Sequence, residues 1–283
     1  MKFEVSLVLP CIILLLGMTI FPFFFCVYIS LTNWTPPSPA GFVGVLNYVA
    51  ALSDPVFYGN ILRTLTFTGV GVATETVLGI GLATLLNRQF RGRAIVRSIF
   101  ILPLAITPVV VGELWRILFH YDFGWINYFL RTVGVPPVVW LGSAQHALAS
   151  CILVDIWQWT PFMTLVALAG LQSVPAEPIE AARIDGASDF AIFFRVTLPL
   201  MQNVVFVGLM FRVVDSLKAF DIIFALTGGG PGNSSQTLNL ATYLQAFFYF
   251  RFYDSATYAI VLYLIVLIFT MIFVRAMRRM GIE

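Results

Sequence analysis

Charged side chains are scarce in this chain of 283 residues: only 11% are Asp, Glu, Lys or Arg, against about 25% in soluble domains. Apolar residues make up 59% and aromatic residues 15%. Such a composition excludes ordinary water-soluble domains and places the chain in lipid. The formal net charge of +2 is too small to indicate a nucleic-acid-binding protein or a polybasic protein of the membrane surface.

The groups that enzymes need are also few. The sequence has two histidines, no His-Glu-x-x-His motif and no Gly-x-Ser-x-Gly motif. A Walker loop requires a lysine after a glycine-rich stretch, and neither Lys2 nor Lys218 has one. Three cysteines lie in apolar runs without metal-ligand spacing and are expected to be packing residues: Cys11, Cys26 and Cys151. The sequence therefore predicts no enzyme, no metal site and no cofactor in this chain, so that any ATP would bind to another subunit.

Six apolar runs are long enough to cross a bilayer, which takes about 20 helical residues. Because lipid offers no partner for backbone N–H and C=O groups, each run must be helical. The runs cover residues 5–31, 61–87, 98–119, 147–172, 204–226 and 256–275. The first is too long for the apolar part of a cleaved signal peptide and is expected to be retained. The sequence therefore predicts one all-α integral membrane domain, residues 1–283, with six transmembrane helices.

The basic residues predict the orientation, since Lys and Arg concentrate in cytoplasmic loops. One set of span ends holds ten basic residues and the other set only three. The richer set is Lys2, Arg88, Arg91, Arg93, Arg97, Arg183, Arg195, Arg275, Arg278 and Arg279. The poorer set is Arg63, Arg131 and Arg251. Both termini, and the segment between spans four and five, are therefore expected in the cytoplasm.

The segment between spans four and five, residues 173–202, is long for a connection between neighbouring helices, which usually takes roughly 2–8 residues. Gly186 fits the end of a short helix over residues 179–185. Ser188 can cap a second helix, and Pro199 is expected to end that helix before span five. Two short ordered helices indicate a docking element for another protein. An ordinary linker with surface helices is the alternative.

Part of this segment resembles a known family signature. The pattern starts with Glu180-Ala181-Ala182, continues after three residues with Gly186, and ends with Val196-x-Leu198-Pro199. It resembles the EAA signature of permease subunits in binding-protein-dependent ABC importers. The residues around Gly186 and Pro199 resemble the carbohydrate branch, which includes permeases for maltose, trehalose and glycerol phosphate. Residues 220–232 resemble the stretch that closes span five in the maltose-F-like half of that branch.

The resemblance implies a type I ABC importer permease (MetI-like) fold with two short cytoplasmic coupling helices, on which a separate ATPase docks. The implied coupling residues are Glu180, Ala181, Ala182, Asp185, Gly186, Phe190, Phe193 and Pro199. The implied partners are a second homologous permease, two copies of an ABC ATPase that binds ATP and Mg, and an extracytoplasmic solute-binding protein. The implied location is the cytoplasmic (inner) membrane of a bacterium or an archaeon.

Eight ionisable residues lie within the predicted spans, where a charge costs about 2.5–3.5 kcal/mol at a helix centre and should face protein or water. They are Glu75, Glu113, Arg116, Asp155, Arg212, Asp215, Lys218 and Asp221. The last four recur every three residues with alternating sign, which predicts a self-neutralising row on one face of span five. The acidic groups of spans three to five fall roughly 8–16 Å below the outer surface, where a polar solute would pass. Holding helices together is the alternative role of the row.

Aromatic residues follow Asp155 in span four, in the order Trp157-Gln158-Trp159-Thr160-Pro161-Phe162. Aromatic faces can stack on a sugar ring while carboxylates and amides bind its hydroxyl groups. In the maltose importer, which the chain resembles, matching stretches of these helices line the sugar site. The predicted substrate pathway is Asp155, Trp157, Trp159, Phe162, Ser216, Asp215 and Glu113. Packing within the bundle is the alternative role of the tryptophans.

Three outer loops, residues 32–60, 120–146 and 233–254, are long enough to carry short helices. The family resemblance implies that they dock the solute-binding protein, and interfacial anchoring by aromatic residues is the alternative.

The sequence as a whole predicts the permease subunit of an ATP-driven importer that moves a disaccharide, oligosaccharide or related polyol by alternating access. The rival function is an ion-coupled secondary transporter of a polar solute. That class offers no reason for the 173–202 segment, and the sequence does not show the repeated halves with paired broken helices that are typical of it.

Overall fold

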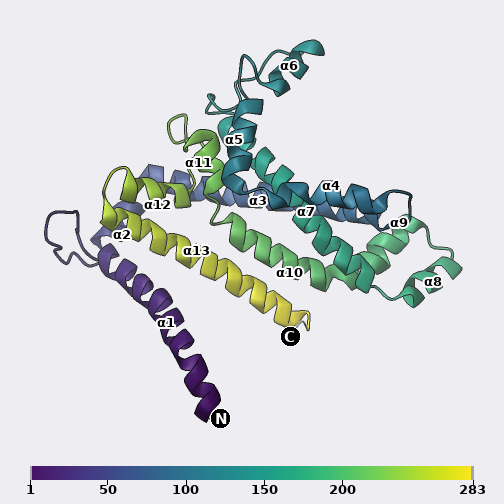
Figure 1. Ribbon diagram of the computed structural model, residues 1–283, viewed down its shortest axis with the longest axis horizontal. Coiled ribbons are helices and arrows are strands. Elements are labelled where there is room, and N and C mark those ends of the chain that lie inside the picture. The colour runs from purple at the N-terminus through teal and green to yellow at the C-terminus, as the bar shows by residue number, and fades with distance from the viewer. Residues whose placement is uncertain (1, 282–283) are drawn as a thin grey trace. The chain divides into compact units, whose positions relative to one another are not determined.

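The computed structural model describes residues 2–281, so that Met1, Ile282 and Glu283 of the predicted domain lie outside the described residues. Within that range the protein is helical and forms no strand (Figure 1); one isolated bridge pairs Thr32 with Phe42. The predicted all-α class is therefore confirmed. The chain divides into two compact units, Met1–Ile61 with Leu238–Ile265, and Leu62–Thr237 with Val266–Glu283.

The first unit contains the N-terminal span and two short helices. Its elements are α1 (Lys2–Ser30), α2 (Leu46–Leu52), the start of α3 (Pro55–Asn87), α12 (Leu238–Phe247) and the first part of α13 (Phe252–Arg279). Asn47 on α2 donates hydrogen bonds to the backbone oxygens of Ser30 and Thr32 at 2.8 and 2.7 Å. The buried ring of Phe57 packs against Tyr258, with 4.7 Å between ring centres.

The second unit contains the rest of α3 and all the segments for which a site is predicted. Its other elements are α4 (Arg93–Ala105), α5 (Pro108–Leu118), α6 (Trp125–Thr132), α7 (Ala147–Ser173), α8 (Ala176–Ile184), α9 (Asp189–Ile192), a π-helical turn (Phe193–Thr197), α10 (Leu198–Ser216) and α11 (Asp221–Thr227). Helix α7 packs against α4, α5, α10 and α11 (Figure 1). A core cluster joins α3, α7 and α10: Ala83, Ala167, Leu168, Met201 and Val205.

Five helices among the described residues are long and apolar enough to cross a membrane. The bent pair α4 and α5 brings the number to six if the pair counts as one span. The bounds of the helices agree with four of the predicted runs within a few residues, since α1, α3, α7 and α13 cover them. The expected pattern of apolar spans is therefore present, but two of the spans are interrupted.

Span three is not the continuous helix that was expected over residues 98–119. Helices α4 and α5 meet at an angle of 98° (Figure 1), and Ile106 and Thr107 between them are extended, with ψ of 135° and 142°. Pro108 explains the break, because a residue before proline is disfavoured in the α conformation. The carbonyl oxygen of Ile106, freed by the break, accepts a hydrogen bond of 3.0 Å from the Nε2 of Gln158 on α7.

Span five is also interrupted. Helix α10 ends at Ser216, where Lys218 and Ala219 form i to i−3 hydrogen bonds, and α11 begins at Asp221. The expectation of one self-neutralising row on a single helical face is therefore wrong. Only Arg212 and Asp215 share α10, and the remaining two charges lie in and after the break.

The sequence predicted that Pro199 ends the second short helix of the 173–202 segment. The structure shows no helix end there. The helical stretch runs from Asp189 to Ser216 without a gap, and Pro199 lies in the first turn of α10. The π-helical turn Phe193–Thr197 comes directly before it. A wider turn at this place gives room for the proline ring and for the carbonyl that lacks an N–H partner. The second short helix is therefore continuous with span five.

Candidate functional site

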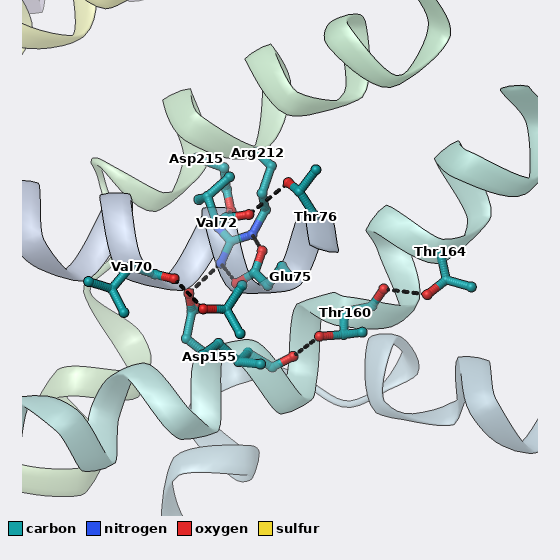
Figure 2. Close-up of polar contacts among 11 residues, drawn as sticks. Val70, Val72, Glu75, Thr76, Asp155, Thr160, Thr164, Arg212 and Asp215 are labelled. Carbon is teal, nitrogen blue, oxygen red and sulfur yellow. Dashed lines mark hydrogen bonds and ion pairs between the residues drawn. The ribbon is translucent and has the colours of Figure 1, made fainter. Parts of the chain in front are cut away.

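A buried cluster of three charged side chains lies in the second unit (Figure 2). Glu75 comes from α3, Asp155 from α7 and Arg212 from α10, and none of the three residues is more than 2% exposed. Arg212 donates from Nε to Glu75 Oε2 at 2.7 Å and from Nη2 to Glu75 Oε1 at 3.0 Å. Its Nη2 also donates to Asp155 Oδ2. One guanidinium group thus joins two carboxylates from two other helices, and we call these three residues the charged triad.

Two glycines allow the helices of the charged triad to approach one another. Gly79 lies one turn after Glu75, and a Cβ at that position would be 2.8 Å from the backbone of Met163 on α7. Gly208 lies one turn before Arg212, and a Cβ there would collide with Val166 on α7. Small residues at a crossing let helix backbones pack closely in membranes. The two close crossings bring α3 and α10 against α7, so that Arg212 can reach both carboxylates.

The Arg212 side chain also reaches two groups outside the charged triad. Its Nη1 donates to Asp215 Oδ2 at 3.4 Å, and the Asp215 side chain is 56% exposed. Its guanidinium carbon lies 4.9 Å from the centre of the Trp159 ring, in a cation–π arrangement. Arg212 therefore connects the buried triad to side chains that face open space.

A partly open cavity of about 120 Å³ lies beside the charged triad. Its charged lining residues are Asp155, Arg212, Asp215, Lys218 and Asp221. Its other lining residues are Pro108, Trp159, Ala219, Phe220 and Ile222. Both interrupted spans contribute to the wall, because Pro108 follows the break in span three and Lys218 to Phe220 form the break in span five. The breaks thus expose backbone and polar groups where a continuous apolar helix would present none.

The structure brings together only part of the predicted substrate pathway. Asp155, Trp159 and Asp215 line the cavity, and Phe162 packs edge-on against Trp159, with 6.3 Å between ring centres. Ser216 follows Asp215 in the chain and is buried, and its hydroxyl has no hydrogen-bond partner within residues 2–281.

Two residues of the predicted pathway lie elsewhere. Trp157 is 41% exposed and packs against Trp115, with 5.5 Å between ring centres. Glu113 forms an ion pair of 3.8 Å with Arg116, and both side chains are more than half exposed. Neither Trp157 nor Glu113 lines the cavity.

Sequence reasoning missed the main partner of Arg212. It identified Glu75 as an ionisable residue within a span but gave it no contact, and it paired Arg212 with its neighbours in span five. A buried guanidinium needs carboxylate partners. A single acidic residue in an apolar span, such as Glu75, is the sequence feature that could have indicated this partner. Spacing along one helix could not reveal the pair, because Glu75 and Arg212 are separated by 137 positions.

Helix α8 ends in the turn that was expected at Gly186. Gly186 has φ of +77°, its N–H bonds to the carbonyl of Arg183, and the N–H of Ala187 bonds to that of Ala182. These two hydrogen bonds and the left-handed glycine form a Schellman motif. Ser188 then caps α9 by accepting a hydrogen bond from the N–H of Ala191 at 3.3 Å. Both local expectations, the glycine turn and the serine cap, are confirmed.

Apolar side chains are exposed on α8, α9 and the turn that follows. Ile184 is 87% exposed, Phe190 74% and Phe194 49%. The rings of Phe190 and Phe194 lie 4.5 Å apart and those of Phe193 and Phe194 5.0 Å apart, between centres. The other predicted coupling residues are in the same segment: Glu180, Ala181, Ala182, Asp185 and Pro199. We call Phe190, Phe193 and Phe194 the phenylalanine cluster.

The three long loops between the spans carry short helices, as expected. They are α2 in residues 32–60, α6 in residues 120–146 and α12 in residues 233–254. Buried Asn127 organises the loop around α6, because its side chain bonds to the backbone of Val138 in both directions at 3.0 Å and accepts from the Trp140 indole at 3.1 Å. Trp125, Tyr128 and Phe129 on α6 are more than half exposed.

The chain is similar to known transport proteins in sequence and in fold. The family model of binding-protein-dependent transport system inner membrane components matches residues 75–280. The trehalose/maltose transport system permease protein MalF of Thermococcus litoralis is 37% identical over 98% of this chain and 94% of its own length. The sulfoquinovosyl glycerol transport system permease protein SmoG of Agrobacterium fabrum is 33% identical over 97% and 90%.

Solved structures of similar fold are ABC transporter permeases. A chain of a bacterial alginate ABC transporter, in complex with an alginate pentasaccharide-bound periplasmic protein, superimposes with a TM-score of 0.86 at 22% identity and covers 99% of this chain and 95% of its own. A chain of the inward-facing MetNI methionine ABC transporter gives a TM-score of 0.55 at 18% identity, covering 78% and 94%. At these identities the likeness shows the fold alone, which is the predicted MetI-like permease fold.

Proposed function

Because this chain belongs to the family of binding-protein-dependent transport system inner membrane components, we propose that it is the permease subunit of an ATP-driven ABC importer for a sugar or related polyol. It is a multi-pass inner-membrane transport subunit rather than an enzyme. The observation that carries the proposal is the polar cavity inside an apolar helix bundle, at the point where two spans are broken. A solute with many hydroxyl groups requires such a polar path through lipid.

The lining of the cavity supports a sugar as the solute. Trp159 offers an aromatic face, and the carboxylates of Asp155, Asp215 and Asp221 can accept hydrogen bonds from hydroxyl groups. A relative named for trehalose and maltose points to the same class. We place Phe162 and Ser216 beside this site. Trp157 and Glu113, which also belong to the predicted pathway, are exposed and could contact a solute only at the surface of the helix bundle.

The size of the cavity supports a second permease subunit. A volume of about 120 Å³ lies well below the roughly 300 Å³ at the lower end of ligand pockets. A disaccharide would therefore need a wall from another chain. We propose a homologous permease that completes the pathway, and a solute-binding protein on the outer side, as the family description indicates.

The exposed phenylalanine cluster supports docking of an ATPase on residues 173–202. A contiguous exposed apolar patch beside an ordered turn is typical of a protein interface. We propose that two ABC ATPase copies, which bind ATP and Mg, dock on the two permeases. Their closure would move α8 and α9 and shift the spans between inward-open and outward-open states. This arrangement puts the segment and both termini in the cytoplasm.

The rival function, ion-coupled secondary transport, is not favoured. Spans three and five are both interrupted, which the sequence did not show, but broken helices alone do not make the repeated halves that are typical of that class. The carboxylates of Glu75 and Asp155, however, are both bound by Arg212. The family match also points to a binding-protein-dependent transport system.

Transport assays on cells that express the assembled importer test the proposal. We expect uptake of labelled trehalose or maltose to stop when ATP is depleted and to survive collapse of the ion gradients by ionophores. The opposite result would establish the rival function. For ATPase docking, Phe190→Ala with Phe194→Ala should reduce co-purification of the ATPase. Phe90→Ala, an exposed phenylalanine of another loop, should leave it unchanged.

A further inference from the structure

The cavity beside the charged triad has more acidic than basic groups. Three carboxylates line it, those of Asp155, Asp215 and Asp221, against two basic groups, those of Arg212 and Lys218. Three negative and two positive charges leave a formal charge of −1 on the wall. Glu75 binds Arg212 but does not line the cavity. Glu75 and the five lining residues together have a formal charge of −2.

The guanidinium of Arg212 has little capacity left for an anionic ligand. Arginine has five N–H donors. The Nε donor and one Nη2 donor bind Glu75, the other Nη2 donor binds Asp155, and one Nη1 donor binds Asp215. Four of the five donors therefore already point at carboxylates. The ring of Trp159 covers part of the guanidinium face, 4.9 Å from its central carbon.

The second basic group of the wall, that of Lys218, is exposed and already has an interaction within the protein. A site for a phosphate, sulfonate or carboxylate group usually offers unpaired basic donors, often an arginine in two-point contact. Here the arginine is buried and held by carboxylates, and the exposed charges of the wall are two acidic groups, Asp215 and Asp221, against one basic group, Lys218.

We propose that this cavity is a charge filter that admits neutral solutes and repels anionic ones. The inference rests on the proposed function and narrows the substrate class to uncharged sugars or polyols. Charges of one sign in a cleft with low-dielectric walls raise the local concentration of the opposite ion by roughly 10- to 1000-fold and lower that of like charges. An acidic sugar would meet this repulsion and find no free guanidinium to offset it.

A cysteine placed in the cavity measures the sign of its potential. Ala219 lines the cavity, and Ala219→Cys introduces a small thiol there. We would purify the full chain with its partner subunits in detergent, with Cys11 and Cys26 replaced by alanine and the buried Cys151 kept. The thiol is treated with a cationic trimethylammonium-ethyl or an anionic sulfonato-ethyl methanethiosulfonate, and the two rates are compared. The control is Ala144→Cys in an exposed outer turn.

The ratio of cationic to anionic rate at position 219 should exceed the control ratio by about tenfold or more. Asp215→Asn and Asp221→Asn, made singly, should each lower the ratio, because each removes one exposed negative charge. A ratio equal to or below that of the control would overturn the proposal. The measurement needs no transport, so that failure of sugar uptake would count against the proposed function without affecting the test of the charge filter.

Discussion

Arg212 on α10 and Glu75 on α3 form a two-point ion pair, with distances of 2.7 and 3.0 Å, between side chains that are 1% and 0% exposed. The pair connects segments 137 positions apart in the chain. Asp155 on α7 binds the same guanidinium. A buried charge without a partner would be costly in an apolar bundle. The ion pairs of the charged triad therefore hold α3, α7 and α10 in one arrangement.

Loss of one partner of this pair should destabilise the protein strongly. Glu75→Gln removes the charge but keeps the shape, and breaking a buried ion pair in this way costs about 3–5 kcal/mol. We expect a clearly lower thermal unfolding midpoint in detergent. Glu113→Gln is the control, because its ion pair with Arg116 is more than half exposed and such pairs contribute about 0–1 kcal/mol. Equal effects of the two changes would contradict the role of the charged triad.

Trp159 and Trp157 offer a matched test of the cavity. They lie two positions apart on α7, but only Trp159 lines the cavity. Trp159→Ala should raise the solute concentration needed for half-maximal uptake by about tenfold, since a stacked aromatic ring contributes roughly 0.5–1.5 kcal/mol beyond its buried area. Trp157→Ala should leave that concentration unchanged. Unchanged affinity in the Trp159 variant would remove this residue from the solute site.

Gly186 should be needed for coupling because of its backbone conformation. Its φ is +77°, and a Cβ there would meet no atom within 4 Å, so that a substitution adds backbone strain rather than a clash. A left-handed residue costs about 1–2 kcal/mol, and asparagine tolerates this conformation best. Gly186→Val should lower the solute transported per ATP hydrolysed, whereas Gly186→Asn should preserve it.

Gly92 provides the control for Gly186. It also has a positive φ, of +85°, in open space, but it lies before α4. Gly92→Val introduces a similar strain away from the coupling segment, and we expect transport per ATP to stay normal. If both valine variants lost coupling to the same degree, strain in general would explain the effect. A direct role of the turn after α8 would then be excluded.

One added methyl group should disturb the contact between α5 and α11. Gly112 on α5 packs on α11, and a Cβ there would be 2.5 Å from the Cβ of Ala225. Gly112→Ala should lower stability by about 1–3 kcal/mol, the usual effect of overpacking. Gly81→Ala on α3, where a Cβ would meet nothing within 4 Å, should have little effect. Thermal unfolding of both variants in detergent checks this difference.

Much of the fold could be predicted because it depends on local composition. Runs such as residues 147–172 must be helical in lipid whatever surrounds them. Gly186 and Ser188 mark helix ends by their own conformational and hydrogen-bonding preferences, and the structure has a Schellman turn and a cap at these positions. Pro108 could have indicated the break in span three. A continuous helix was predicted instead, because residues 98–119 are apolar throughout most of their length.

Composition and local residue preferences were enough to predict that the chain lies in a membrane, which segments are apolar enough to span it, and that a turn occurs at Gly186. The binding of Arg212 to Glu75 and Asp155, and the set of pathway residues that share a cavity, follow from how the helices pack. The physical reason is that a helix fixes the spacing of its own side chains but not the identity of its neighbours. Those neighbours are set by close crossings, such as those at Gly79 and Gly208, between segments far apart in the chain.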